Sequence, residues 1–248
     1  MKKFCIFLIL SLLLAGPMFS QHFYIGVNGA VNSTWITNVK NAAMPDMDYK
    51  TTIHPSFGLN IGYQFNQHLA LVLMPGYGTL GQKLKDSYTT DTIIAKSTSS
   101  PNEYARDIKL TYFQIPLLFK YSVGGEVTKF FVAVGPQFNM LMSAKQTFTK
   151  NGSTWNDTFT NPITGKVEVR GKEDIKDHYN SMDIQARLDF GLEFMVAKKL
   201  MIDAGLNLGY SLMDINASDW KVTKKASESY TASHNLVGGF TVGVNYVF

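Results

Sequence analysis

The stretch MDIQARLDFGLEF, residues 182–194, alternates between apolar and polar side chains along its whole length. Its even-numbered positions, from Met182 to Phe194, are all apolar, and most of its odd-numbered positions carry Asp, Gln, Arg or Glu. Side chains alternate between the two faces of a strand, so this segment needs an apolar medium on one side and a polar space on the other. A β-barrel embedded in lipid supplies both, with hydrocarbon outside and polar groups in the lumen.

The same alternation recurs in eight segments, each long enough for a tilted membrane strand of about 9–11 residues. They are residues 23–32, 55–65, 68–79, 110–121, 130–142, 182–194, 200–212 and 236–248. In every segment one parity is apolar and free of charge, while the other holds polar side chains and many glycines. A lipocalin-like soluble barrel would have the opposite arrangement. We therefore expect an all-β fold, an eight-stranded antiparallel transmembrane up-and-down β-barrel with polar and small residues pointing inward.

The connections between these segments alternate between short and long. Tight turns lie at residues 66–67, 124–125 and 196–199, whereas the polar joins cover residues 33–54, 80–109, 143–181 and 213–235. Outer-membrane barrels have short periplasmic turns and long extracellular loops. The β-like runs at residues 92–96 and 166–170 are expected to extend hairpins above the lipid, and a ten-stranded barrel is the alternative.

The chain begins with a segment that has the layout of a secretory signal peptide. Lys2 and Lys3 precede an apolar run at residues 4–15, which is too short to span a membrane as a helix and is followed by small residues up to Ser20. We expect a signal peptide at residues 1–20 and a barrel domain at residues 21–248. The single cysteine, Cys5, lies in the signal segment, so the mature chain should have no disulfide or thiol chemistry.

Composition argues against a nucleic-acid partner. The formal net charge is +4 with 17% charged residues, and no basic run stands out. The mean hydropathy of -0.03 is compatible with a membrane barrel, because barrel strands expose only half of their residues to lipid. Outer-membrane lipid is therefore an expected partner.

Aromatic residues cluster near the ends of the predicted strands, as interfacial girdles require. The last strand, LVGGFTVGVNYVF, ends on an aromatic residue and resembles the C-terminal signal read by the outer-membrane assembly machinery. The location expected from these features is the outer membrane, crossed several times.

The segment TYFQIPLLFKY, residues 111–121, together with FVAVGPQFNML, residues 131–141, and the glycine-rich last strand, resembles a known family. This is the outer-membrane β-barrel family of Bacteroidota that includes PorT-like proteins. The resemblance implies a barrel across residues 22–248. PorT is associated with type IX secretion, so a secretion-related accessory role is one expectation that the resemblance brings.

Eight strands enclose just enough space for side chains, so a wide pore is not expected. The charged residues predicted to fill the lumen, which we call the luminal network, are Lys120, Asp183, Arg187, Asp189, Glu193 and Asp203. Tyr112 and Gln114 have the same inward parity. We expect these groups to satisfy one another through salt bridges and hydrogen bonds. A narrow or gated ion path through the same residues is the alternative.

Catalytic motifs are absent from the sequence: there is no phosphate loop, Rossmann fingerprint, nucleophile elbow or paired-cysteine metal motif. His54, His178 and His234 each precede an inward-running strand, and serine and aspartate residues lie nearby, but spacing alone does not make a triad or a metal site. We therefore expect no enzyme activity, cofactor or metal. An outer-membrane enzyme acting on lipid or peptide at the extracellular rim is the second hypothesis, and a small channel is the third.

The long loops hold most of the sequence without an assigned role. They are expected to contact another outer-membrane protein, a secreted protein or lipopolysaccharide, which fits an accessory or interaction component of the cell envelope. Trp155 and Trp220 are the candidate contact residues, because exposed Trp is enriched at binding hot spots. The alternative is that both pack on neighbouring loop residues.

Overall fold

The structure is a computed structural model. It describes residues 22–38, 47–86, 104–150, 152–154, 157–160, 167–170, 172–221 and 229–248. The predicted signal peptide, the run at residues 92–96 and Trp155 lie outside the described residues. No helix within the described ranges is long and apolar enough to cross a membrane.

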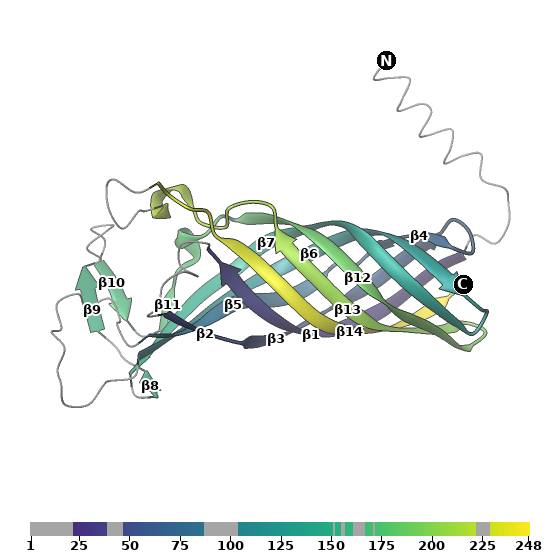
Figure 1. Ribbon diagram of the computed structural model, residues 1–248, viewed down its shortest axis with the longest axis horizontal. Helices are drawn as coiled ribbons and strands as arrows, with labels where there is room; N and C mark the ends of the chain where they lie inside the picture. The colour runs from purple at the N-terminus through teal and green to yellow at the C-terminus, as the bar shows by residue number, and fades with distance from the viewer. Residues whose placement is uncertain are drawn as a thin grey trace, which may run out of the picture.

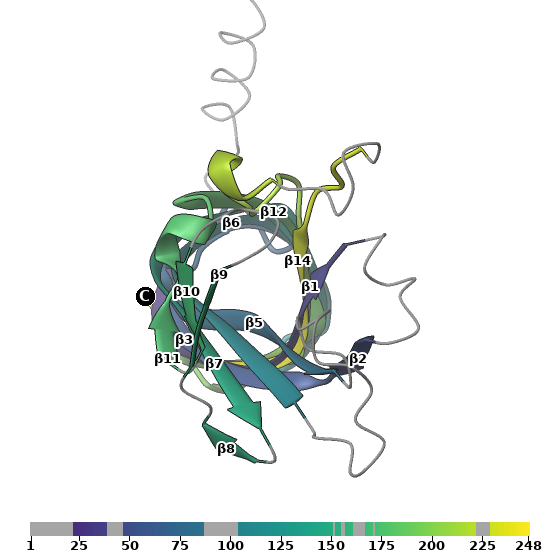
Figure 2. The ribbon, with the colours of Figure 1, turned by 90° about the vertical axis from the view of Figure 1, so that its left-hand side faces the viewer.

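Antiparallel strands form a closed eight-membered ring, which Figure 2 shows end-on. In ring order they are β1 (His22–Thr37), β3 (Thr52–Gln64), a third strand divided into β4 (Leu69–Leu73) and β5 (Gly76–Asp86), then β6 (Tyr104–Gly124), β7 (Thr128–Lys150), β12 (Met182–Ala197), β13 (Leu200–Ser211) and β14 (His234–Val247). β14 pairs with β1 in register from Tyr24↔Val247 to Thr37↔His234, and this pairing closes the ring. The predicted eight-stranded antiparallel barrel is confirmed.

One predicted strand, residues 68–79, is broken in the structure. β4 and β5 are separated at Met74 and Pro75, where proline has no N–H to donate to the ladder. The wall stays hydrogen-bonded there, because the Met74 N–H donates to the Pro116 carbonyl at 3.0 Å and the Pro75 carbonyl accepts from the Leu59 N–H at 2.9 Å.

Above this break, β5 leaves β3 and follows β6. The backbone register between β3 and β5 covers three residue pairs, Ser56↔Gly78, Phe57↔Tyr77 and Gly58↔Gly76. Further out, side-chain hydrogen bonds hold this part of the wall: Thr52 Oγ1 accepts from the Lys83 N–H at 3.0 Å, and Thr34 Oγ1 donates to the Gly81 carbonyl at 3.1 Å. We call this part of the wall the β3–β5 seam.

The strands extend beyond the predicted segments on the side of the long loops. β6 has 21 residues and β7 has 23, well above the length that a membrane crossing needs. Short strands lie at this end: β2 (Met47–Lys50) pairs with β5, β8 (Ser153–Thr154) and β11 (Lys172–Asp174) pair with β7, and β9 (Asp157–Thr160) pairs with β10 (Val167–Arg170). Figure 1 shows β9 and β10 as a hairpin beyond the barrel end, so residues 167–170, the described part of the predicted run, add no strand to the ring.

Tight turns close the opposite end. The Gly125 N–H donates to the Thr128 carbonyl at 2.9 Å, and Gly124 has φ 149°, a conformation that favours glycine. The end of the chain lies here too, since the Phe248 N–H donates to the Phe23 carbonyl and the two rings pack with centroids 5.7 Å apart. These contacts form part of the predicted aromatic girdle.

The two faces of the wall differ as the alternation predicts. Outward-facing Phe57, Phe119 and Val31 are 65%, 61% and 60% exposed, whereas inward-facing Asn60 and Asn139 are 3% and 0% exposed. Apolar surface on this scale needs hydrocarbon around it.

Candidate functional site

The luminal network begins near the tight-turn end with a buried ion pair. Lys120 on β6 and Glu193 on β12 pair through the ammonium and a carboxylate oxygen, and their side chains are 7% and 9% exposed. The same ammonium lies 4.5 Å from the ring centroid of Phe131 and 5.7 Å from that of Tyr24. Asp203 on β13 is close enough to interact electrostatically with Lys120. These contacts satisfy the charges within the wall.

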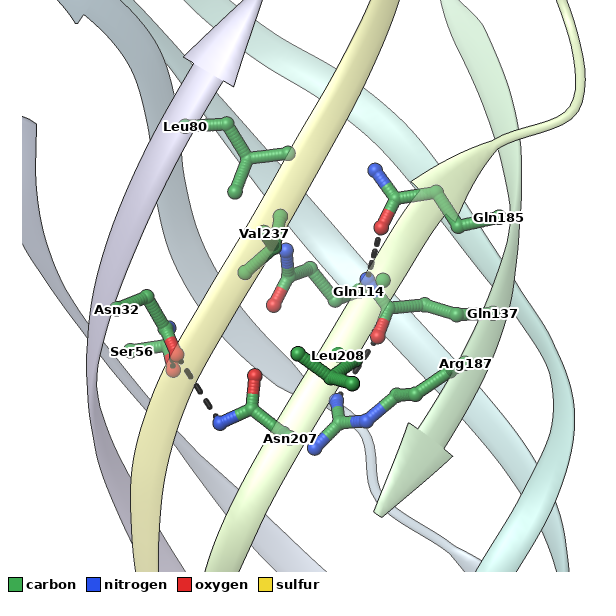
Figure 3. A pocket seen from close by; sticks show the side chains of 11 residues that line it. Asn32, Ser56, Leu80, Gln114, Gln137, Gln185, Arg187, Asn207, Leu208 and Val237 are labelled. Atoms are coloured by element: carbon green, nitrogen blue, oxygen red, sulfur yellow. Dashed lines mark hydrogen bonds between the residues drawn. The ribbon is translucent and has the colours of Figure 1, made fainter.

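Arg187 on β12 lies further out and bonds to its own strand and to the neighbouring β7. Its Nε and Nη2 donate to the two oxygens of Asp189 at 2.8 and 2.9 Å, and its Nη1 donates to Gln137 Oε1 at 2.8 Å. Gln137 in turn donates to Gln185 at 3.3 Å, as Figure 3 shows, and Gln185 donates to Asp183 at 2.9 Å. The amides therefore form a directed series of hydrogen bonds from the guanidinium to the Asp183 carboxylate.

Asparagines and Asp203 connect four strands near the Lys120–Glu193 pair. Asn28 donates to Asn60 at 2.6 Å, Asn60 donates to Asn245 at 2.9 Å, and Asn245 donates to Asp203 at 2.9 Å. Gly243 makes this possible, because a Cβ there would overlap the Asp203 carboxylate. The network thus depends on small residues as well as on polar ones.

Two small cavities remain between these side chains. Each has a volume of about 20 Å³, room for about one water molecule, and Ser56, Gln114 and Arg187 line both. The middle of the lumen is therefore packed with side chains.

The outer part of the lumen contains an apolar cluster, which differs from the prediction that polar and small residues point inward. Ile175 and Ile215, from two different loops, are each 1% exposed and pack inside the barrel. We call this cluster the apolar cap; its buried members are Leu80, Ile108, Leu110, Tyr112, Leu141, Ala144, Ile175, Ile215 and Val237. The cap thus packs two loop residues against four strands at the outer end of the lumen.

Part of this cap could be predicted from the alternation in the sequence. Ile108 and Leu110 have the same parity as inward-facing Gln114 and Lys120, but the predicted segment began too late to include Ile108. The position of Ala144 could not be predicted, because the register shift of β7 opposite Thr111 and Tyr112 is a β-bulge that brings Ala144 to the inner face. Sequence alternation alone does not locate such a bulge.

A polar cluster, which we call the loop clamp, holds the loop between β13 and β14 over the cap. The Asp214 carboxylate accepts hydrogen bonds from the Ser233 N–H at 3.0 Å and from the Tyr230 hydroxyl at 2.8 Å, and Lys221 pairs with it at 3.1 Å. Asn180, from the loop that precedes β12, donates to the Asp214 carbonyl at 2.8 Å. The clamp therefore ties two outer loops together.

The electrostatics of the clamp follow from these contacts. Partial burial opposes ionisation, but the hydrogen bonds from the Ser233 N–H, Lys221 and Tyr230 outweigh it, so the pKa of Asp214 is lowered from its ordinary 3.8. Burial and the neighbouring Asp214 carboxylate raise the pKa of Tyr230 to about 12. At neutral pH Asp214 is ionised and Tyr230 keeps its proton.

The predicted candidate residues at the rim have separate surroundings. His54 Nδ1 contacts Thr34 Oγ1 at 3.3 Å, and His234 Nδ1 contacts the Ser211 carbonyl at 3.1 Å. The His178 ring stacks on Trp220 with centroids 3.4 Å apart. Trp220 thus packs on a neighbouring loop residue, the alternative that the sequence left open. Within the described residues no cluster of three or more His, Cys, Asp or Glu could hold a metal ion.

Comparison with solved structures gives similarity to outer-membrane barrels. Neisserial surface protein A (Neisseria) is 12% identical with a TM-score of 0.43, over 90% of this chain and 96% of its own. The outer membrane protein OprG from Pseudomonas aeruginosa is 12% identical with a TM-score of 0.42, over 92% and 96%. Ail, the attachment invasion locus protein of Yersinia pestis, is 14% identical with a TM-score of 0.37, over 91% and 98%. These likenesses carry no functional argument, and no curated protein gives a significant match.

The family described as "Outer membrane protein beta-barrel domain" matches residues 19–217, most of the chain. This match agrees with the closed antiparallel ring and its exposed apolar face. The chain therefore belongs to the outer membrane protein beta-barrel domain family, and it is a multi-pass protein of the outer membrane.

Proposed function

We propose that the protein is a non-catalytic scaffold of the outer membrane, an accessory or interaction component of the envelope that presents its outer loops to a protein partner. The observation that carries this proposal is the apolar cap, in which the loop residues Ile175 and Ile215 are buried. A lumen filled in this way leaves no wide path for solutes, and the same contacts hold its loops in place.

The long strands support this proposal. β6 and β7 extend past the membrane-crossing length and continue into the outer loops. The loop clamp adds hydrogen bonds between two of those loops. Loops held on a rigid scaffold are common binding surfaces.

The proposal includes two more specific assignments, a PorT-like family with a secretion-related role and a cleaved signal peptide. The resemblance of residues 111–121 and 131–141 supports a PorT-like barrel of Bacteroidota with a secretion-related role. The basic and apolar segment at the start supports a signal peptide that is removed after Ser20. N-terminal sequencing of the protein from outer membranes tests the cleavage, and Gln21 is the expected first residue.

Affinity purification from native outer membranes tests the partner. We expect a specific protein to co-purify with the tagged wild-type chain and to be reduced in a Trp220→Ala variant. Lys198→Ala, in a tight turn at the opposite end, is the matched control and should retain the partner. Equal recovery of the partner protein with both variants would mean that Trp220 is not part of the contact surface. If no specific protein co-purified, the result would argue against the scaffold function.

Conductance in planar bilayers tests the alternative of a channel. The wild-type barrel should give no discrete current steps, because the apolar cap and the luminal network fill it. An Ile175→Gly and Ile215→Gly double variant removes the two loop side chains from the cap and should increase the frequency of current steps. Stable single-channel steps from the wild type would favour the channel instead.

A further inference from the structure

The luminal network holds more negative than positive groups. It has two cations, Lys120 and Arg187, and four carboxylates, Asp183, Asp189, Glu193 and Asp203. Lys120 pairs with Glu193, and Arg187 pairs with Asp189. Asp203 interacts electrostatically with Lys120, but Asp183 has no ion pair among the described residues. Asp183 is therefore the carboxylate whose charge most needs a partner.

Asp183 is enclosed on all sides, at 1% exposure. Its Oδ2 accepts four hydrogen bonds from neutral groups: from Asn139 at 3.3 Å, Gln185 at 2.9 Å, Ser211 at 2.8 Å and Asn235 at 3.2 Å. Its other oxygen, Oδ1, is buried without a hydrogen-bond partner. One half of the carboxylate is thus saturated and the other half is bare.

Asn235 has the same deficit. Its side chain is 0% exposed, and its Oδ1 is also buried without a partner. Its Nδ2 contacts Asp183 Oδ2 at 3.2 Å and Tyr112 Oη at 3.4 Å. The two bare oxygens therefore belong to the two side chains that meet in the Asp183–Asn235 contact, and the Tyr112 hydroxyl touches the same Asn235 side chain.

With Asp183 as a carboxylate, the two bare oxygens are both acceptors and cannot satisfy each other. A water molecule would donate to both but would leave the carboxylate charge without compensation, and buried charges are normally paired or bound to a cation. We propose that Asp183 Oδ1, Asn235 Oδ1 and the Tyr112 hydroxyl bind a monovalent cation such as Na⁺. One uncompensated carboxylate matches a single positive charge, whereas a divalent ion requires more anionic ligands.

The position of this site suits a retained ion. Tyr112 belongs to the apolar cap, and Asp183 lies beneath it, next to the Gln185 and Gln137 amides that lead to Arg187. An ion held here is shielded from the outer solvent and neutralises the outer end of the network. It acts as part of the fold.

Thermal unfolding of the whole mature protein in detergent tests the site. The midpoint Tm is measured in NaCl and in choline chloride at equal ionic strength, because choline is too large for the site. We expect Na⁺ at 100 times its dissociation constant to raise the wild-type Tm by roughly 5–10 °C. Crystals soaked in thallium(I) should show an anomalous peak between Asp183 and Asn235.

Asp183→Asn is the specific variant. Its amide oxygen replaces Oδ2, and its amide nitrogen replaces Oδ1 and can donate to Asn235 Oδ1, so the variant should fold and lose the Na⁺ shift. Asp203→Asn is the matched control and should keep the shift, since it changes a luminal carboxylate elsewhere. Equal Tm values for the wild type in the two salts, a shift that persists in Asp183→Asn, or no thallium peak at the junction would each overturn the proposal.

Discussion

Replacing Lys120 with methionine removes the cation that pairs with the buried Glu193 carboxylate while keeping most of the side-chain volume. Both groups are more than nine-tenths buried, so the carboxylate left behind has little access to water. Loss of one partner from a buried pair costs about 3–5 kcal/mol of unfolding free energy. Glu193→Gln should cost less, roughly 1–2 kcal/mol, because Asp203 still faces the ammonium and the charge-assisted hydrogen bond becomes a weaker one.

The double variant distinguishes a buried pair from two independent contacts. Methionine and glutamine together leave neither charge in the wall, so Lys120→Met with Glu193→Gln should be more stable than Lys120→Met alone. Urea unfolding in detergent, followed by tryptophan fluorescence, gives the four free energies of a double-mutant cycle. A cost near zero for Lys120→Met, as for an exposed pair, or additive effects within about 0.5 kcal/mol would refute the reasoning.

Further predictions concern the wall and the loops. A Cβ at Gly62 would overlap the buried Tyr24 ring, so Gly62→Ala should cost about 1–3 kcal/mol in the same urea assay; Gly29→Ala, with its nearest neighbouring atom 3.8 Å away, is the matched control and should change stability little. Phe240 is 52% exposed on the outer face, and Phe240→Arg should cost about 2–4 kcal/mol in vesicles, whereas a smaller cost would move this residue away from the bilayer midplane. The lowered pKa of Asp214 means that the ionised clamp adds stability above the ordinary pKa of 3.8 and loses it as pH falls through the lower folded pKa. Pepsin cleavage of the β13–β14 loop should therefore increase as pH falls through the folded pKa of Asp214. The Asp214→Asn variant should be cleaved readily at every pH tested. A pH dependence of cleavage in this variant equal to that of the wild type would contradict the role of the carboxylate.

The sequence predicted the wall of the barrel better than its contents. Alternation at residues 182–194 matches β12 because each inward residue there is polar or glycine and each outward residue is apolar. Alternation says less where both parities are apolar, as near Leu110, and nothing about loop residues such as Ile175 that fold back into the lumen. The pairing of Arg187 with Asp189 follows from their shared face, but Ser211 and Asn235, two of the partners of Asp183, come from other strands far along the sequence.

The β3–β5 seam has a consequence for the depth at which the protein sits in the bilayer. Backbone groups that leave the continuous strand ladder are disfavoured in contact with hydrocarbon, because no water is available there to complete their hydrogen bonding. The acyl chains of the outer leaflet must therefore end at about the level where continuous pairing ends, at Ser56 and Gly78. Phe57 and Tyr77, whose ring centroids are 6.2 Å apart, lie at that level and mark the membrane–water interface on the outer side.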